Sequence, residues 1–388
     1  MIEKWCCVKP ESIVRVGVVK TATPYFDTLS YIPGSVLRGA VAEWLSMNGR
    51  EGDIKAFVEN VRFGCFTPSS FKSISLPFPM SALECKRHGY FTNVPSGVTP
   101  GHGIRDLLLL STAYFELKRQ GVKLPVPLNL RCLREGCGGR LEQASGFYTR
   151  TKDGWVKCSV EKTVQTKVAL SRHRRGAQEH ALYSVVGIKP KGYFTGRIWV
   201  KSEEYLELVR VAVEEVGIGS LTTRGFGRVK LSFPSELSLP GVEERVAAFN
   251  SKLREVWSSL AELARVSGSR ASEEPEYTYF SVDLLSPAIF RERGLPSLKL
   301  SLGGEFEPVL WMAQPAFVGG FSTAWGIPKP AELGACMGSV YVFRTKASEE
   351  EISPFLRRLE EEGVGERVDE GYGDVLICHP FHCEVMPV

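Results

Sequence analysis

The segment "VGIGSLTTRGFGRVKL", residues 216 to 231, constrains the fold more than any other stretch of the chain. It follows the helical pattern "SEEYLELVRVAVEEVG" and precedes the strand pattern "RVKLSF". A dinucleotide-binding loop needs the reverse order, with a strand before the glycines and a helix after them. Because the strand pattern "GYFTGRIWV" stands before this helix, the order strand, helix, glycine loop, strand predicts the closing half of a ferredoxin-like unit.

The composition of this loop favours binding to a phosphate chain. Glycine frees backbone N–H groups that can cradle an anion, and the loop has four: Gly217, Gly219, Gly225 and Gly227. Arg224 and Arg228 flank them, and Phe226 is the only aromatic residue. The strand signature of RNA-recognition motifs is only partly present, because Arg228 and Leu231 stand where stacking aromatics are expected. The alternative is a tight turn that needs positive φ.

A second basic feature lies upstream of the loop. The formal net charge of the 388 residues is only +4, yet residues 162 to 175 contain no acid. The five cations of this segment are Lys162, Lys167, Arg172, Arg174 and Arg175, and His173 lies among them. Such cations repel one another unless a polyanion neutralises them. We therefore predict RNA contacts from Lys167, Arg172, His173, Arg174 and Arg175, the alternative being a solvated charged face.

The ten cysteines indicate metal ligands or free thiols rather than disulfides, because no secretion signal precedes them. No apolar run approaches the roughly 20 residues of a membrane span, so we expect a cytoplasmic protein without membrane contact. Cys132 and Cys137 have the spacing of a zinc knuckle. Cys85 and His102 complete the predicted zinc site. His88 and Cys65 remain alternative ligands, and isolated buried thiols are the other interpretation.

The chain is predicted to be α+β with two domains. Residues 1–235 form the first, with an irregular Pro/Gly-rich insertion at about 61–147 that zinc would stabilise. Residues 236–273 form a helical connector, and residues 274–388 form the second domain. A helix is expected to start at an N-cap on Ser35 and to end at Gly49. The histidines of "CHPFHC", residues 378 to 383, are expected in the core.

Several motifs, taken in order, resemble one protein family. "LSYIPGSVLRGAVAEWL" and the glycine loop resemble segments of the CRISPR-associated RAMP superfamily. The large two-domain RAMP subunit of type III-D effector complexes is similar to this chain in the following segments: "LPFPMSALECKRHGYF", "GHGIRDLL", "CLREGCGGRL", "ALYSVVGIKPKGYFTGRI", "GGFSTAWGIPKPAELGACMGSVYVFR" and "GYGDVLICHPFH". The resemblance covers most of the chain.

The resemblance implies two ferredoxin-like domains and a subunit that is not an enzyme. Such a subunit grips the 5′ repeat-derived tag of the guide RNA (crRNA), beside the large signal-generating subunit and the backbone RAMP subunits. Arg38, early on the first helix, is then expected to reach the tag. The alternative is a guide-processing, metal-independent endoribonuclease that uses His173, Tyr183 and the arginines. A scaffold that contacts only protein is the third possibility.

Overall fold

The computed structural model describes residues 1–17, 25–89, 102–124, 130–151, 154–171, 173–322 and 326–385. They form a mixed α+β structure with several small, mostly antiparallel sheets, which confirms the predicted fold class at that level. In the described residues, no helix combines the length and apolar character needed to cross a membrane.

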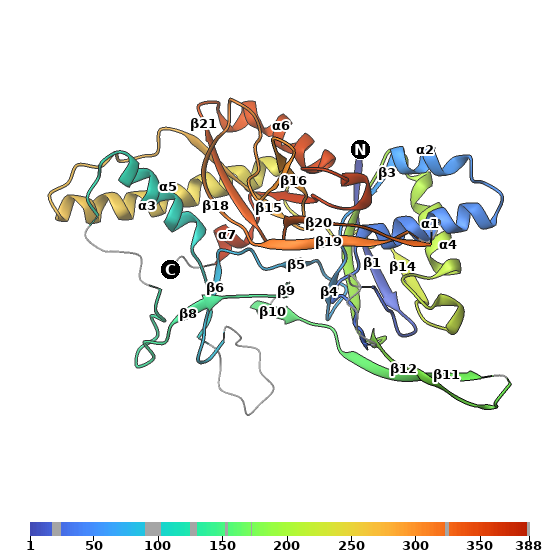
Figure 1. Cartoon of the computed structure of the whole chain (residues 1–388). Coiled ribbons are helices and arrows are strands. Elements are labelled where there is room, and N and C mark those ends of the chain that lie inside the picture. Colours follow the sequence, from blue (N-terminus) through green and yellow to red (C-terminus); the bar gives the residue numbers. More distant parts are fainter. Residues whose placement is uncertain are drawn as a thin grey trace.

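The first sheet has the order β14-β1-β13-β3, with β4 also paired to β13, and all its pairs are antiparallel. Its strands are β1 (Ile2–Pro10), β3 (Val61–Phe63), β4 (Thr67–Ser69), β13 (Tyr193–Val200) and β14 (Val229–Ser232). Helices α1 (Gly34–Met47), α2 (Asp53–Asn60) and α4 (Glu204–Val216) share one hydrophobic core with it. Figure 1 shows α1 and α4 together beside this sheet.

Helix α1 begins two residues earlier than the sequence suggested. Its N-cap is Pro33 in an extended conformation, without a side-chain cap, so the expectation that Ser35 caps the helix was wrong. Proline suits this position because its fixed φ precedes a helix without strain. The end was predicted correctly: the helix stops at the C-cap Asn48, and Gly49 has a φ of 68°.

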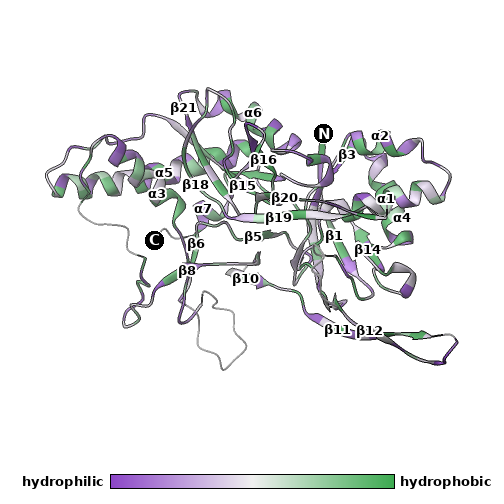
Figure 2. Cartoon of the chain, in the orientation of Figure 1, coloured by the Kyte–Doolittle hydropathy of each residue, from purple (hydrophilic) through white to green (hydrophobic). Residues whose placement is uncertain are grey.

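The second sheet has the order β18-β21-β15-β22. Its strands are β15 (Thr278–Leu284), β18 (Glu307–Met312), β21 (Val340–Thr345) and β22 (Val375–Ile377). Helix α6 (Glu349–Glu362) starts with a capping box between Ser348 and Glu351, which satisfies two N–H groups at its first turn. The predicted connector is α5 (Val242–Val266), a long helix that packs on β15 and β22. In Figure 2, hydrophobic and hydrophilic residues alternate along α5, as its one buried face requires.

Between β4 and β13 the chain leaves the first sheet and builds several small sheets. The elements are β5 (Ser75–Pro77), β6 (Ala82–Cys85), β7 (Ile104–Asp106), α3 (Leu108–Arg119), β8 (Leu141–Gln143), β9 (Phe147–Thr151), β10 (Gly154–Cys158), β11 (Lys162–Ser171) and β12 (Gly176–Ile188). The short β2 (Tyr25–Phe26) pairs with β12 in parallel. We call the segment between β4 and β13 the excursion. It starts after residue 69, whereas the sequence suggested an insertion from about residue 61, because β3 and β4 belong to the first sheet. Helix α3 packs on α5, in the hydrophobic core of the second sheet.

The second sheet carries a copy of the glycine loop. Residues 363 to 373, "GVGERVDEGYG", repeat the glycine spacing of residues 217 to 227, "GIGSLTTRGFG". Both loops contain a 3-10 turn, η1 (Thr222–Arg224) and η2 (Val368–Glu370), flanked on both sides by left-handed residues. The second copy is acidic where the first is basic or neutral, at Glu366, Asp369, Glu370 and Asp374.

The second glycine loop packs on the first domain and on a long hairpin. This hairpin consists of β19 (Pro315–Ser322) and β20 (Ile327–Ala335). Three short elements complete this half of the chain: β16 (Phe290–Glu292), β17 (Leu295–Ser297) and α7 (Phe381–Glu384). Asp369 pairs with Arg38 of α1 at 2.7 Å, and Glu370 pairs with Lys329 of β20. A Cβ atom at Gly371 would lie 3.0 Å from Cα of Gly34, so only glycine allows this approach.

Buried charges join the two sheets. Arg197 of β13 donates to both carboxylate oxygens of Asp374, and the two side chains are each 1% exposed. Arg62 of β3 lies 3.5 Å from the same carboxylate. Glu360 of α6 accepts two hydrogen bonds from Arg245 of α5 and lies 3.9 Å from Arg197. The two domains therefore share one buried ionic network.

A second buried ionic group fastens the excursion to the second sheet. His382 of α7 bonds Asp106 at the end of β7 through Nδ1 and Asp283 of β15 through Nε2, each at 2.8 Å. His379 and His382 are both 1% exposed, so the two histidines of "CHPFHC" are core residues, as expected. Burial alone would lower the pKa of His382, but Asp283 and Asp106 raise it to about 10.

We expect this group to make stability depend on pH. The pKa of His382 is higher in the folded chain than the 6.5 of a free imidazole, so proton binding favours folding. The contribution is complete below about pH 6.5 and is lost as pH rises through about 10. Urea unfolding between pH 6 and pH 10 should show this loss, and it should be smaller in His382→Gln. Identical pH profiles for the two proteins would contradict the assignment.

Candidate functional site

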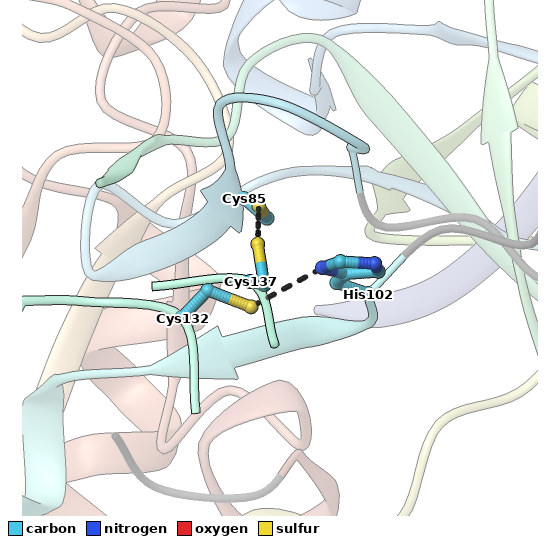
Figure 3. A group of neighbouring side chains, drawn as sticks. All are labelled: Cys85, His102, Cys132 and Cys137. Atoms are coloured by element: carbon cyan, nitrogen blue, oxygen red, sulfur yellow. Dashed lines mark hydrogen bonds between the residues drawn. The ribbon is translucent and has the colours of Figure 1, made fainter. Parts of the chain in front are cut away.

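Four potential metal ligands meet in the excursion. Cys85 ends β6, His102 lies just before β7, and Cys132 and Cys137 bracket a short turn before β8. Their ligand atoms all lie within 4.8 Å of one another. The sulfurs of Cys85 and Cys137 are 3.7 Å apart, and the sulfur of Cys132 lies 3.3 Å from Nδ1 of His102 (Figure 3). The structure thus brings together the four residues that the sequence suggested.

The geometry fits a tetrahedral ion. Metal–sulfur bonds of about 2.3 Å place two tetrahedral ligand sulfurs roughly 3.8 Å apart, close to the separation of Cys85 and Cys137. The alternative ligands lie outside the group. The ring of His88 stacks on that of His102 at 4.1 Å, whereas Cys65 lies at the domain junction beside Gly34 and Asp374.

The local backbone supports this cluster. Gly136 and Gly138, on either side of Cys137, have φ values of 76° and 51°, which lets the chain turn tightly at this cysteine. A Cβ atom at Gly139 would lie 3.2 Å from the sulfur of Cys137 and 3.3 Å from that of Cys85. Burial raises the pKa of Cys85, but hydrogen bonds from the backbone N–H groups of Arg87 and His88 and from the thiols of Cys137 and Cys132 together lower it. The pKa of Cys132 is raised instead, by burial and by the neighbouring thiols, so Cys85 is the thiol of this pair that favours the thiolate form.

The basic segment forms the β11–β12 hairpin, which extends away from the first sheet in Figure 1. Midway along the hairpin, Nζ of Lys167 lies 4.8 Å from the ring centre of Phe226 in the glycine loop. Arg224 of the same loop donates to the hydroxyl of Tyr183, the cross-strand partner of Lys167, at 3.0 Å. We call the surface made by Lys167, Tyr183, Arg224 and Arg228 the loop–hairpin surface.

The cations of the loop–hairpin surface lack acidic partners. In the described ranges, no carboxylate forms an ion pair with Lys167, Arg224 or Arg228. Strand alternation adds two cations that the sequence analysis missed. Lys9 of β1 pairs directly with Lys230 of β14, and both are exposed beside Arg228. The alternation in "RVKLS" is the signal that would have found Lys230.

Three of the four loop glycines use their N–H groups in the packing of the loop itself, which differs from the anion nest that the sequence suggested. The N–H groups of Gly217, Gly225 and Gly227 donate to the carbonyls of Val213, Thr222 and Ile13. These donors are therefore already occupied. The exposed charged groups of the loop are the side chains of Arg224 and Arg228.

Two further expected contacts differ from the structure. Phe226 is only 6% exposed, so its ring supports Lys167 from beneath and has no face for a base, contrary to expectation. Arg38 is paired with Asp369 of the second glycine loop. A contact between Arg38 and RNA would have to compete with that ion pair.

The remaining candidates lie at the tip of the hairpin. His173, Arg174 and Arg175 are exposed in the turn between β11 and β12, and Arg172 lies outside the described residues. Lys167, the partner of Tyr183, stands four residues of β11 before Ser171, where the turn begins, which is roughly 13 Å at the usual rise of a strand. His173 and Tyr183 therefore do not share one site.

Comparison with known proteins gives two family matches, each over more than half of the chain. The model of the family "CRISPR-associated protein (Cas_Cmr3)" matches residues 124–380, and that of the "RAMP superfamily" matches residues 10–230. The search of curated proteins found no match.

Several solved structures are similar at low identity. A chain of the type III-B Cmr-beta complex bound to cognate target RNA aligns with 12% identity over 96% of both chains, at a TM-score of 0.44. A chain of the Csm3–Csm4 subcomplex from the type III-A CRISPR-Cas interference complex aligns with 15% identity over 89% of this chain and 95% of that chain, at a TM-score of 0.34. Both scores are low, so the family assignment rests on the two family models.

We expect Gly219 and Gly225 to differ in their tolerance of alanine. Both have a positive φ, 82° and 84°, which costs an alanine about 1–2 kcal/mol. A Cβ atom at Gly219 would also lie 2.3 Å from the carbonyl oxygen of Arg15, whereas one at Gly225 meets nothing within 4 Å. Gly219→Ala should therefore unfold at clearly lower urea concentration than Gly225→Ala. Equal destabilisation would contradict this packing role.

Proposed function

The chain belongs to the RAMP superfamily and to its CRISPR-associated Cas_Cmr3 family, and from this we propose that it is a non-catalytic, guide-RNA-binding subunit of a type III effector complex. In this role it grips the 5′ repeat-derived tag of the guide and caps the backbone of RAMP subunits. We assign it to the type III-D kind, with the large signal-generating subunit as a neighbour. It works in the cytoplasm, which agrees with ten cysteines that form no disulfide.

We infer a ferredoxin-like arrangement for both sheets. In the first, β1, α1, β3, β13, α4 and β14 follow one another, and the first strand lies between the third and the fourth. The second sheet repeats this order with β15, β18, β21, α6 and β22. It has no helix between β15 and β18 in the described residues, and α5 packs on β15 and β22.

The loop–hairpin surface is the observation that carries RNA binding. Cations cost little at a protein surface when acids neutralise them, but here the described residues provide no acidic partner. Phosphates of RNA supply that neutralisation, and released counterions add to the affinity. The hydroxyl of Tyr183 holds Arg224 in place beside Lys167, so the two cations stand ready for adjacent phosphates.

The nuclease alternative has weaker support. Cleavage through the 2′-hydroxyl needs a base, an acid and a cation around one phosphate. His173 stands exposed at the hairpin tip, and Tyr183 lies midway along the hairpin, where its hydroxyl accepts a hydrogen bond from Arg224. These positions favour binding along a strand of RNA over chemistry at one bond.

We propose that the ion held by Cys85, His102, Cys132 and Cys137 is zinc, with a structural role. Three thiolates and one imidazole are a common set of ligands for structural zinc. The sheet β6–β7–β8 is small, and few apolar residues support the cluster, namely Leu83 and Leu141 with Leu107 beside them. A bound ion would replace the missing core, because metal binding in such a module is folding energy.

We expect one zinc ion per purified chain. Cys132→Ser combined with Cys137→Ser removes half of the ligands, so elemental analysis should show loss of the ion and thermal unfolding should start at lower temperature. Cys336→Ser is the control, because Cys336 lies outside the cluster. Equal zinc content in all three proteins would refute the site.

We expect RNA binding to depend on salt through the loop–hairpin surface. Each phosphate neutralised on single-stranded RNA adds about 0.7 to the slope of log affinity against log salt. Fluorescence anisotropy with a labelled guide tag should give a slope smaller by about this step in Arg224→Ala and in Lys167→Ala.

Arg358→Ala is the matched control, because Arg358 is an exposed cation on α6, without an ion pair in the described part of the chain. Slopes that stay equal in all variants would favour a scaffold that contacts only protein. The same samples should contain intact RNA. Specific cleavage that disappears in His173→Ala would instead establish the nuclease.

A further inference from the structure

A basic pocket adjoins the metal cluster. It has a volume of about 460 Å³ and is lined by Arg87, Leu130, Arg131, Gly138 and Arg140. Three of its five lining residues are arginines, and all three are exposed. Figure 1 shows β6 and β8, which carry this region, well apart from the β11–β12 hairpin. The pocket is therefore separate from the loop–hairpin surface.

The backbone forces two of these arginines together. Arg131 and Arg140 are direct partners in an antiparallel bridge, and the bonds from Cys132 N–H to the carbonyl of Gly139 and from Leu141 N–H to that of Leu130 flank it. Directly opposed residues have Cβ atoms roughly 5 Å apart, and like charges in such a pair are destabilising. The repulsion between Arg131 and Arg140 is therefore unfavourable for folding, although both positions are exposed and would accept neutral residues.

Neighbouring acids do not relieve this repulsion. In the part of the chain that the structure describes, neither Arg131 nor Arg140 forms an ion pair. The nearby Glu142 pairs with Lys86 at 3.8 Å. The two guanidinium groups thus remain available to an external anion.

The metal cluster does not account for both cations. A divalent ion with three thiolates and one imidazole carries a single net negative charge, which one arginine can balance. Arg87 occupies that position, because its guanidinium donates to the carbonyl of Cys137 at 3.1 Å. Arg131 and Arg140 are then in excess over what the cluster needs.

We propose that Arg131 and Arg140 bind phosphate groups of a single-stranded RNA, as a second contact of this chain with nucleic acid. The inference rests on the proposed function for its choice of ligand, since guanidinium groups match phosphate oxygens with paired, charge-assisted hydrogen bonds. Leu130, 45% exposed, lines the same pocket and offers an apolar contact to a sugar or base. The metal fixes the turn that presents the arginines, so it orders this contact.

The test compares two double variants of the full-length chain. Arg131→Ala with Arg140→Ala removes the pocket cations, and Arg270→Ala with Arg358→Ala removes two exposed cations elsewhere. Binding of labelled single-stranded guide RNA is measured by anisotropy across salt concentration. The pocket variant should bind about tenfold more weakly, and its salt slope should fall by roughly 1.4, for two lost phosphates. The control should match the wild type.

Further readouts separate the possible failures. Unchanged zinc content in the pocket variant shows that the turn remains folded, and photo-crosslinking of 4-thiouridine RNA should label the peptide containing residues 130 to 140. Normal RNA binding by the pocket variant overturns this inference, and the proposed function stands if Lys167→Ala and Arg224→Ala weaken binding. If those variants also bind normally, the proposed function fails as well. Displacement of RNA from the pocket by ATP or inorganic phosphate at equimolar concentration would identify a site for free phosphates and overturn the RNA assignment.

Discussion

The buried ionic network between the two sheets determines how the rest of the molecule is arranged. Arg197 and Asp374 are each 1% exposed, so neither charge has access to water. Removing one member of such a pair costs about 3–5 kcal/mol, because the other is left buried without a counter-charge. Gly64 makes room for the Arg197–Asp374 pair, since a Cβ atom at this position would lie 2.4 Å from the Asp374 carboxylate. The two domains therefore meet in one defined orientation.

The excursion is anchored to the second sheet by buried charges and by hydrophobic packing. His382 binds Asp106 of the excursion and Asp283 of the second sheet, and α3 contributes Leu108, Leu109, Ala113 and Leu117 to the second core. The strands that carry the metal ligands thus start from an anchored point. A metal ion has only to order the outer part of this module, where the hydrophobic contacts are few.

Local patterns made much of this structure predictable. The helix before the glycine loop, the strand after it and the cysteine spacing all depend on residues close in sequence, and all appear as expected. Amphipathic spacing shows which face of a helix is buried but not what covers it, so the packing of α3 on α5 could not be foreseen. The pairing of Arg38 with Asp369 depends on residues far apart in the chain, and the distance between the hairpin tip and the loop depends on strand register.

The two glycine loops show that one backbone shape can carry opposite charges. Glycines and left-handed residues at equivalent positions specify the turn in both copies, while the residues between them differ in charge. An acidic copy meets the arginine of a neighbouring helix, and a basic copy remains open. Because the glycine spacing specifies the turn, the residues between the glycines can differ in charge without changing the backbone, and that charge decides whether the loop pairs with a neighbouring helix or leaves its arginine exposed.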